Sequence, residues 1–159
     1  MATQSKGNLI NAILKAGLLA GALDITIACV QFYIKTGKNP VIVLQYIASA
    51  VFGKEEAYAN TGSMPVYGLL FHFLIAFGWT ILLFVIYPRI SFLRKNVILT
   101  AVIYGLFVWL MMNMVIVPMT KIIPAKFDFS KAWIQMLILI VAIGLPVTCF
   151  AKKYYSRKN

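Results

Sequence analysis

Four polar side chains stand inside stretches of the sequence that are otherwise apolar, and their types are the ones best suited to chemistry. They are Asp24, His72, Asn113 and Gln135. An aspartate beside a histidine in a medium of low dielectric can share a proton or form an ion pair, as in proton relays and ligand counter-ions. The residue types therefore suggest a ligand or proton site built from these four side chains.

A structural role is the alternative for each of these residues. Polar side chains in membrane helices often do no more than hydrogen-bond between helices, each contributing about 0.6 to 2 kcal/mol. We favour that role for Asn113 and Gln135. For Asp24 the two interpretations are balanced, because burying a carboxylate costs at least about 2.5 kcal/mol. His72 is then either the structural partner of Asp24 or a proton carrier or ligand.

Other patterns that carry chemistry are absent from the sequence. There is no HExxH, GxSxG or Walker sequence, and no apolar stretch holds paired carboxylates. One histidine without suitably placed cysteines cannot form a usual zinc site, and Cys29 and Cys149 form no CxxC motif. The two cysteines are expected near opposite membrane faces, without a disulfide between them. We therefore expect no catalytic residues, no metal, no cofactor and no enzymatic activity.

The composition indicates a membrane-spanning fold. Of 159 residues, 62% are hydrophobic and 12% are charged, whereas charged residues make up about 25% of a soluble domain. Fifteen Lys and Arg stand against four Asp and Glu, mostly at the ends of apolar runs. Membrane topology explains this charge better than nucleic acid does, so the expected partner is the lipid bilayer and no nucleic acid.

Four stretches reach the roughly 20 apolar residues that a spanning helix needs. They run from about Leu9 to Ile34, Met64 to Tyr87, Val97 to Val117 and Ala132 to Phe150. The predicted fold is all-α, a single transmembrane domain over residues 1–159 with a bundle of four spanning helices.

A fifth apolar stretch, Pro40 to Gly53, is too short to span the bilayer. Its proline suits a helix start and its glycine a helix end, so a helix of about three turns is expected. We favour an interfacial helix, because Gln45 and Ser49 are four residues apart and could form a narrow polar stripe. A short re-entrant element is the alternative.

The positions of Lys and Arg predict the orientation. Nine lie on the side of both termini: Lys6, Lys15, Arg89, Arg94, Lys95, Lys152, Lys153, Arg157 and Lys158. Six lie on the other side: Lys35, Lys38, Lys54, Lys121, Lys126 and Lys131. Both termini are therefore expected in the cytoplasm.

Residues four apart share a helix face, and small residues on that face let helix backbones approach closely. Such series are Ala12, Ala16, Ala20, Asp24 and Ala28; Gly68, His72, Ala76 and Thr80; Ala101, Gly105, Trp109 and Asn113; and, seven apart, Gln135 and Ala142. The four polar residues are therefore expected to point inward and to gather in the outer half of the bundle, beneath the segment from Pro40 to Gly53. Pro146 is expected to kink the fourth span.

Four pieces of the sequence carry a resemblance to a known family. They are AGALD, QYIASAVFG, GLLFHF and YGLFVWLMMNMVIVP. Together they resemble an uncharacterised family of small bacterial four-span membrane proteins, and the resemblance covers most of the chain. It implies a multi-pass protein of the bacterial inner membrane and transfers no activity and no residue roles.

Two functions fit these observations. The first is a non-enzymatic membrane protein with an outward-facing intramembrane polar pocket for a small ligand or a proton, with a homo-oligomer needed for transport. The alternative is a structural or accessory subunit of a larger membrane complex, whose polar residues serve helix packing. Small-residue faces turned inward favour the pocket, and a spare small face turned to lipid favours the subunit.

Overall fold

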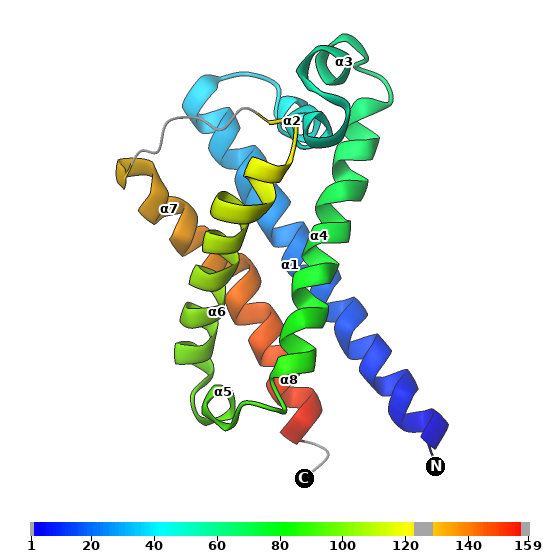
Figure 1. The fold of residues 1–159 in the computed structure, drawn as a ribbon, viewed down its shortest axis with the longest axis vertical. Coiled ribbons are helices and arrows are strands. Elements are labelled where there is room, and N and C mark those ends of the chain that lie inside the picture. The colour runs from blue at the N-terminus through cyan, green and yellow to red at the C-terminus, as the bar shows by residue number, and fades with distance from the viewer. Residues whose placement is uncertain (1, 123–128, 157–159) are drawn as a thin grey trace.

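The computed structural model describes residues 2–122 and 129–156, and over these residues the fold is all-helical (Figure 1). The long helices are α1 (Ala2–Thr36), α4 (Met64–Ile86), α6 (Val97–Met111), α7 (Phe129–Leu139) and α8 (Leu145–Ser156). The short ones are α2 (Val41–Phe52), α3 (Lys54–Ala59) and α5 (Ser91–Lys95). The start of α1 and the end of α8 lie at one end of the bundle, here named the terminal end, and α2 and α3 lie at the other, the α2 end.

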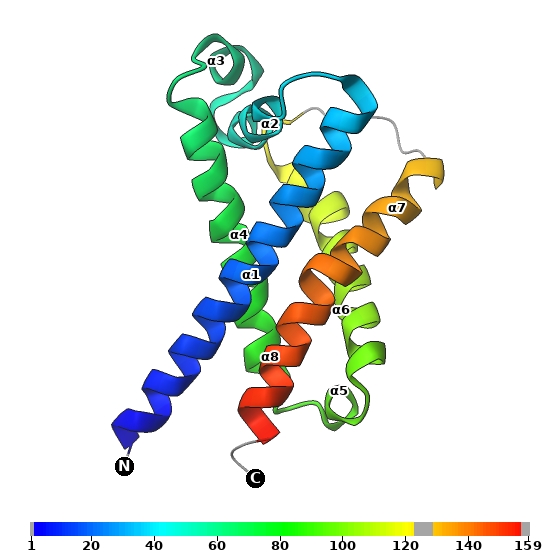
Figure 2. The same cartoon turned by 180° about the vertical axis from the view of Figure 1, so that it is seen from behind.

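Two π-helical segments and a 3₁₀ turn complete the long elements. The segment η1 (Met112–Ile116) and the turn η2 (Val117–Met119) continue α6, and η3 (Ile140–Gly144) joins α7 to α8. Seen from behind in Figure 2, α1 crosses the bundle, where it packs against both α4 and α8.

Four helical stretches in the described residues are long and apolar enough to cross a bilayer: Leu9–Thr36, Met64–Ile86, Val97–Met119 and Ala132–Ser156. The predicted spans are confirmed to within a few residues, except that the fourth continues to Ser156. Only 22 to 33% of the most apolar window of each span is buried inside the protein. Large apolar side chains such as Leu70, Leu74 and Ile98 are therefore left on the outer surface, where lipid rather than water suits them. The chain is a multi-pass membrane protein.

The short apolar helix between the first two spans is confirmed as α2, which lies crosswise over its end of the bundle (Figure 1). Its polar stripe faces protein rather than water. Gln45 is buried and donates a hydrogen bond to the Ala57 carbonyl at 3.2 Å, and Ser49 is buried and donates to the Tyr46 carbonyl at 2.6 Å. Gln45 therefore ties α2 to α3, whereas the Ser49 hydrogen bond stays within α2. The exposed face of α2 is apolar and aromatic, with Val41, Tyr46 and Phe52.

The small-residue faces of α1 and α4 are buried, as predicted. Ala16 and Ala20 have no exposed surface. A Cβ atom on Gly17 would stand 2.5 Å from the ring of Phe77, and one on Gly21 would stand 2.7 Å from the ring of Phe73. These two glycines therefore let the aromatic side chains of α4 pack directly on the α1 backbone.

Glycine also permits the closest approaches elsewhere in the bundle. A Cβ atom on Gly68 would stand 1.9 Å from the Leu44 carbonyl oxygen, so α2 rests on the bare backbone of α4. At the crossing of α6 and η3, a Cβ atom on Gly105 would meet the Ile140 backbone at 2.6 Å, and one on Gly144 would meet the Ala101 carbonyl at 2.3 Å. These contacts leave no room for a larger residue.

Each of the two π-helical segments ends two residues before a proline: η1 before Pro118 and η3 before Pro146. The Val117 amide bonds to the Met112 carbonyl ahead of Pro118, and the Leu145 amide bonds to the Ile140 carbonyl ahead of Pro146, each across five residues. A proline removes one amide donor and its ring clashes with the carbonyl four residues back, which disturbs the preceding turn. The disturbance predicted at Pro146 therefore takes the form of a π turn. This turn rotates the residues before it relative to the residues after it around the helix axis.

Gly68→Ala should destabilise the protein by at least about 2 kcal/mol, because the new methyl group overlaps backbone that cannot rotate away. Gly78→Ala is the matched control on the same helix, since Gly78 is exposed and nothing lies within 4 Å of its added Cβ. Thermal unfolding in detergent, followed by circular dichroism, measures both. Equal melting temperatures for the two variants would contradict the packing described for α2.

Thr148→Val should raise stability by about 1 kcal/mol. The Thr148 hydroxyl is buried without a hydrogen-bond partner among the described residues, so its removal relieves a desolvation cost. Thr100→Val is the control, because the equally buried Thr100 hydroxyl donates to the Leu93 carbonyl at 2.8 Å and its loss should destabilise the protein. The prediction is wrong if the two substitutions shift the melting temperature in the same direction.

Candidate functional site

Asp24 of α1 and His72 of α4 lie within electrostatic reach of each other, where α1 packs on α4. The His72 Nε2 atom lies 2.8 Å from the Gly21 carbonyl oxygen. Because a carbonyl oxygen only accepts, Nε2 carries a hydrogen and donates it. Asp24 follows Gly21 by three residues, about one turn of helix, and its carboxyl group interacts electrostatically with His72. Both side chains are half-buried.

The His72 ring is held in place before any ligand or proton arrives. Its edge-to-face contact with Phe73 has a centroid distance of 5.5 Å and an interplanar angle of 78°. Phe73 in turn packs against Gly21. The hydrogen bond to the Gly21 carbonyl and the contact with Phe73 therefore fix the orientation of the His72 ring.

Asn113 and Gln135 do not point inward, contrary to the prediction from spacing. Both side chains are exposed, and the Asn113 amide donates to the Trp109 carbonyl of its own helix at 2.9 Å. Asn113 lies in η1, and the buried Ala142, which was expected to share a face with Gln135, lies in η3. The prediction assumed 3.6 residues per turn throughout, and a π turn breaks that register.

A cavity of about 340 Å³ lies between α1, α2 and α3 at the α2 end. Its lining includes Ala28, Phe32 and Lys35 of α1 with Tyr46 and Tyr58. Ala28 follows Asp24 by four residues, so the cavity begins on the same face of α1, about 6 Å further along the helix. Burial raises the pKa of Tyr46, and Tyr58 raises it further, so this wall of the cavity stays uncharged at neutral pH.

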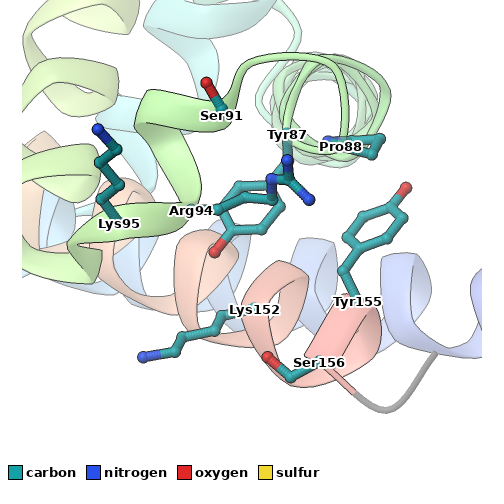
Figure 3. Close-up of a pocket in the computed structure, with 8 residues that line it drawn as sticks. All are labelled: Tyr87, Pro88, Ser91, Arg94, Lys95, Lys152, Tyr155 and Ser156. Carbon is teal, nitrogen blue, oxygen red and sulfur yellow. The ribbon is translucent and has the colours of Figure 1, made fainter. Parts of the chain in front are cut away.

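Sequence reasoning missed a second group of residues, at the terminal end. It counted Arg94, Lys95 and Lys152 only as charges that set the orientation. The structure places them around a cavity of about 460 Å³ together with Tyr87 and Tyr155 (Figure 3). Basic residues next to tyrosines near span ends were the available signal, but only the fold shows that α5 and α8 meet.

The cysteines and the acidic residues offer no metal centre in the part of the chain that the structure describes, where no three His, Cys, Asp or Glu side chains gather. Cys29 and Cys149 are free thiols. Cys29 lies near the α2 end, where its thiol approaches the Pro40 carbonyl at 3.9 Å. Cys149 lies in α8 towards the terminal end, so the two occupy opposite ends as predicted.

Comparison of the chain with known protein families, with curated proteins and with solved structures finds no match. The resemblance to a bacterial family is therefore not supported by a family match. What the fold itself supports is the coarser statement, a four-span membrane protein.

Proposed function

We propose that this is a non-enzymatic membrane protein in which Asp24 and His72 form an intramembrane site for a proton or a small ligand. The observation that carries the proposal is the hydrogen bond from His72 Nε2 to the Gly21 carbonyl. It orients a titratable ring beside a carboxyl group in a region where an isolated charge is costly. Such a pair can exchange one proton while its surroundings stay fixed.

The cavity at the α2 end supports access to this pair from one side. Its nearest lining residue on α1, Ala28, is one turn from Asp24. Lys35 and Tyr58 stand at the same cavity. If the α2 end faces outward, as the distribution of Lys and Arg favours, the site opens towards the outside.

The packing of the small residues also favours this function over a docking subunit. The glycines on the predicted faces of α1, α4 and α6 are all buried against neighbouring elements of the same chain. In the described spans, none of these glycine-containing faces is therefore left exposed for another protein to pack against.

A second candidate function, as a subunit of a homo-oligomer or a larger membrane complex, is favoured by one observation. Asn113 and Gln135 expose amide groups from the membrane-spanning helices. Amides on the outside of a bundle can hydrogen-bond to a neighbouring helix. This candidate makes the Asp24–His72 pair a packing element rather than a site.

His72→Gln and Asp24→Asn separate the two functions. A glutamine amide can still donate to the Gly21 carbonyl but does not titrate. We expect wild-type stability in detergent to vary between about pH 5 and pH 8, because the proposed pair exchanges a proton in that range, and each substitution to remove that variation. Asn113→Ala is the control and should keep it.

Three outcomes of this pH series are informative. Loss of the pH dependence in both variants, with folding retained, supports the site. An unchanged pH dependence in both contradicts it. Strong destabilisation of both variants, with a wild-type stability that does not vary over this pH range, assigns the pair to packing and favours the subunit.

The proposed orientation predicts which of two fused reporter proteins is active at each end of the bundle. Green fluorescent protein fused after the C-terminus should fluoresce in a bacterial host, because that end is proposed to lie in the cytoplasm. Alkaline phosphatase inserted in the exposed turn at Thr61 and Gly62 should be active, because that turn is proposed to lie outside. The reverse pattern in both fusions would invert the orientation and close the proposed outward access.

A further inference from the structure

The cavity at the terminal end has the composition of an anion site. It lies where the end of α4, the short helix α5 and the last turns of α8 meet. Arg94 and Lys95 of α5 and Lys152 of α8 are among the lining residues, and Figure 3 shows Arg94 extended between Tyr87 and Tyr155, with the ends of both lysines pointing outward. None of the described lining residues is acidic. Three basic residues therefore line one cavity of about 460 Å³, with no carboxylate among its described lining.

Neutral hydrogen-bond donors accompany these charges. Ser91 and Ser156 line the cavity with Tyr87. Burial raises the pKa of Tyr87, which Arg94 lowers and Cys149 raises to smaller extents, so its hydroxyl stays protonated and able to donate. A guanidinium, two ammonium groups and three hydroxyls match a phosphate group, which offers several acceptor oxygens and a negative charge.

The walls of this cavity are fixed by contacts that need no ligand. The Tyr155 hydroxyl donates to the Phe84 carbonyl at 2.7 Å, and its ring stacks on Tyr87 with a centroid distance of 5.8 Å. On the other side, the Thr100 hydroxyl donates to the Leu93 carbonyl and ties α5 to α6. A site organised in advance loses less entropy when it binds.

The cavity also lies at the level where a bilayer presents its headgroups. The second span ends at Ile86 and the fourth at Ser156, both at this cavity. Ile90 and Phe92, which flank and form α5, expose apolar side chains beside it. Basic pockets at the ends of membrane helices bind lipid headgroups through the phosphate.

From these observations we propose that the cavity between α4, α5 and α8 binds a phosphate group, carried by an anionic phospholipid headgroup or by a soluble phosphate compound. Positive charge that only sets topology would not need to line a cavity. Lys153 and Arg89 differ from Arg94 and Lys152 in this respect. They lie on the same side of the membrane but are not among the described residues that line the cavity. This proposal does not depend on the Asp24–His72 site.

The test compares two double variants of equal charge in the purified full chain. Arg94→Gln with Lys152→Gln removes two charges from the cavity, and Arg89→Gln with Lys153→Gln removes two charges beside it. Binding of short-chain phosphatidylglycerol, short-chain phosphatidylcholine and inorganic phosphate is measured by native mass spectrometry and by the shift in melting temperature. We expect the cavity variant to bind its phosphate probe roughly thirtyfold more weakly, at about fivefold for each basic residue, and the control variant to bind as wild type does.

Each outcome decides the proposal. Selective stabilisation by phosphatidylglycerol that only the cavity variant loses assigns the site to a lipid headgroup, and the same pattern with inorganic phosphate assigns it to a soluble compound. Equal weakening in both variants would overturn the proposal in favour of diffuse surface charge, as would the absence of any response in wild type. If the double variant fails to fold, Lys152→Ala against Lys153→Ala repeats the comparison on neighbouring residues of one helix.

Discussion

Contact between bare helix backbones is the interaction on which the rest of this structure depends. Lipid chains are as apolar as the side chains that face them, so expulsion of water does not hold the spans together, and close packing must do so. The glycines at positions 17, 21, 68, 105 and 144 supply that closeness. At Gly21 the consequence is chemical as well as mechanical. The missing side chain lets Phe73 settle on α1, and the neighbouring His72 then reaches the Gly21 carbonyl.

The two ends of the bundle are stabilised by different kinds of contact. At the α2 end, a buried hydrogen bond from Gln45 holds α2 to α3, and tyrosines line the cavity above Asp24. At the terminal end, aromatic stacking and a threonine hydrogen bond fix a strongly basic cavity. A cavity lined by apolar side chains and tyrosines at one end and a basic cavity at the other are thus separated by the apolar packing of the bundle.

Regular parts of the fold could be predicted from the sequence, and irregular parts could not. Span length, apolar composition and the four-residue spacing in α1 and α4 depend on ordinary helix geometry, so the buried faces of these two helices followed from them. Asn113 and Gln135 were misplaced because a π turn changes the count of residues per turn. The basic cavity was missed because Arg94 and Lys152 are far apart in sequence, and only tertiary packing joins them.

The prolines that follow η1 and η3 give this protein a way to change its outer surface with very few substitutions. A π turn holds one residue more than the regular turn it replaces, and one residue corresponds to about 100° of rotation around the helix axis. Reverting η3 to regular helix would therefore turn the face of α7 relative to α8, so that Gln135 would point in a different direction. Replacing Pro146 would then change which residues of α7 face outward while every other residue of α7 stayed the same.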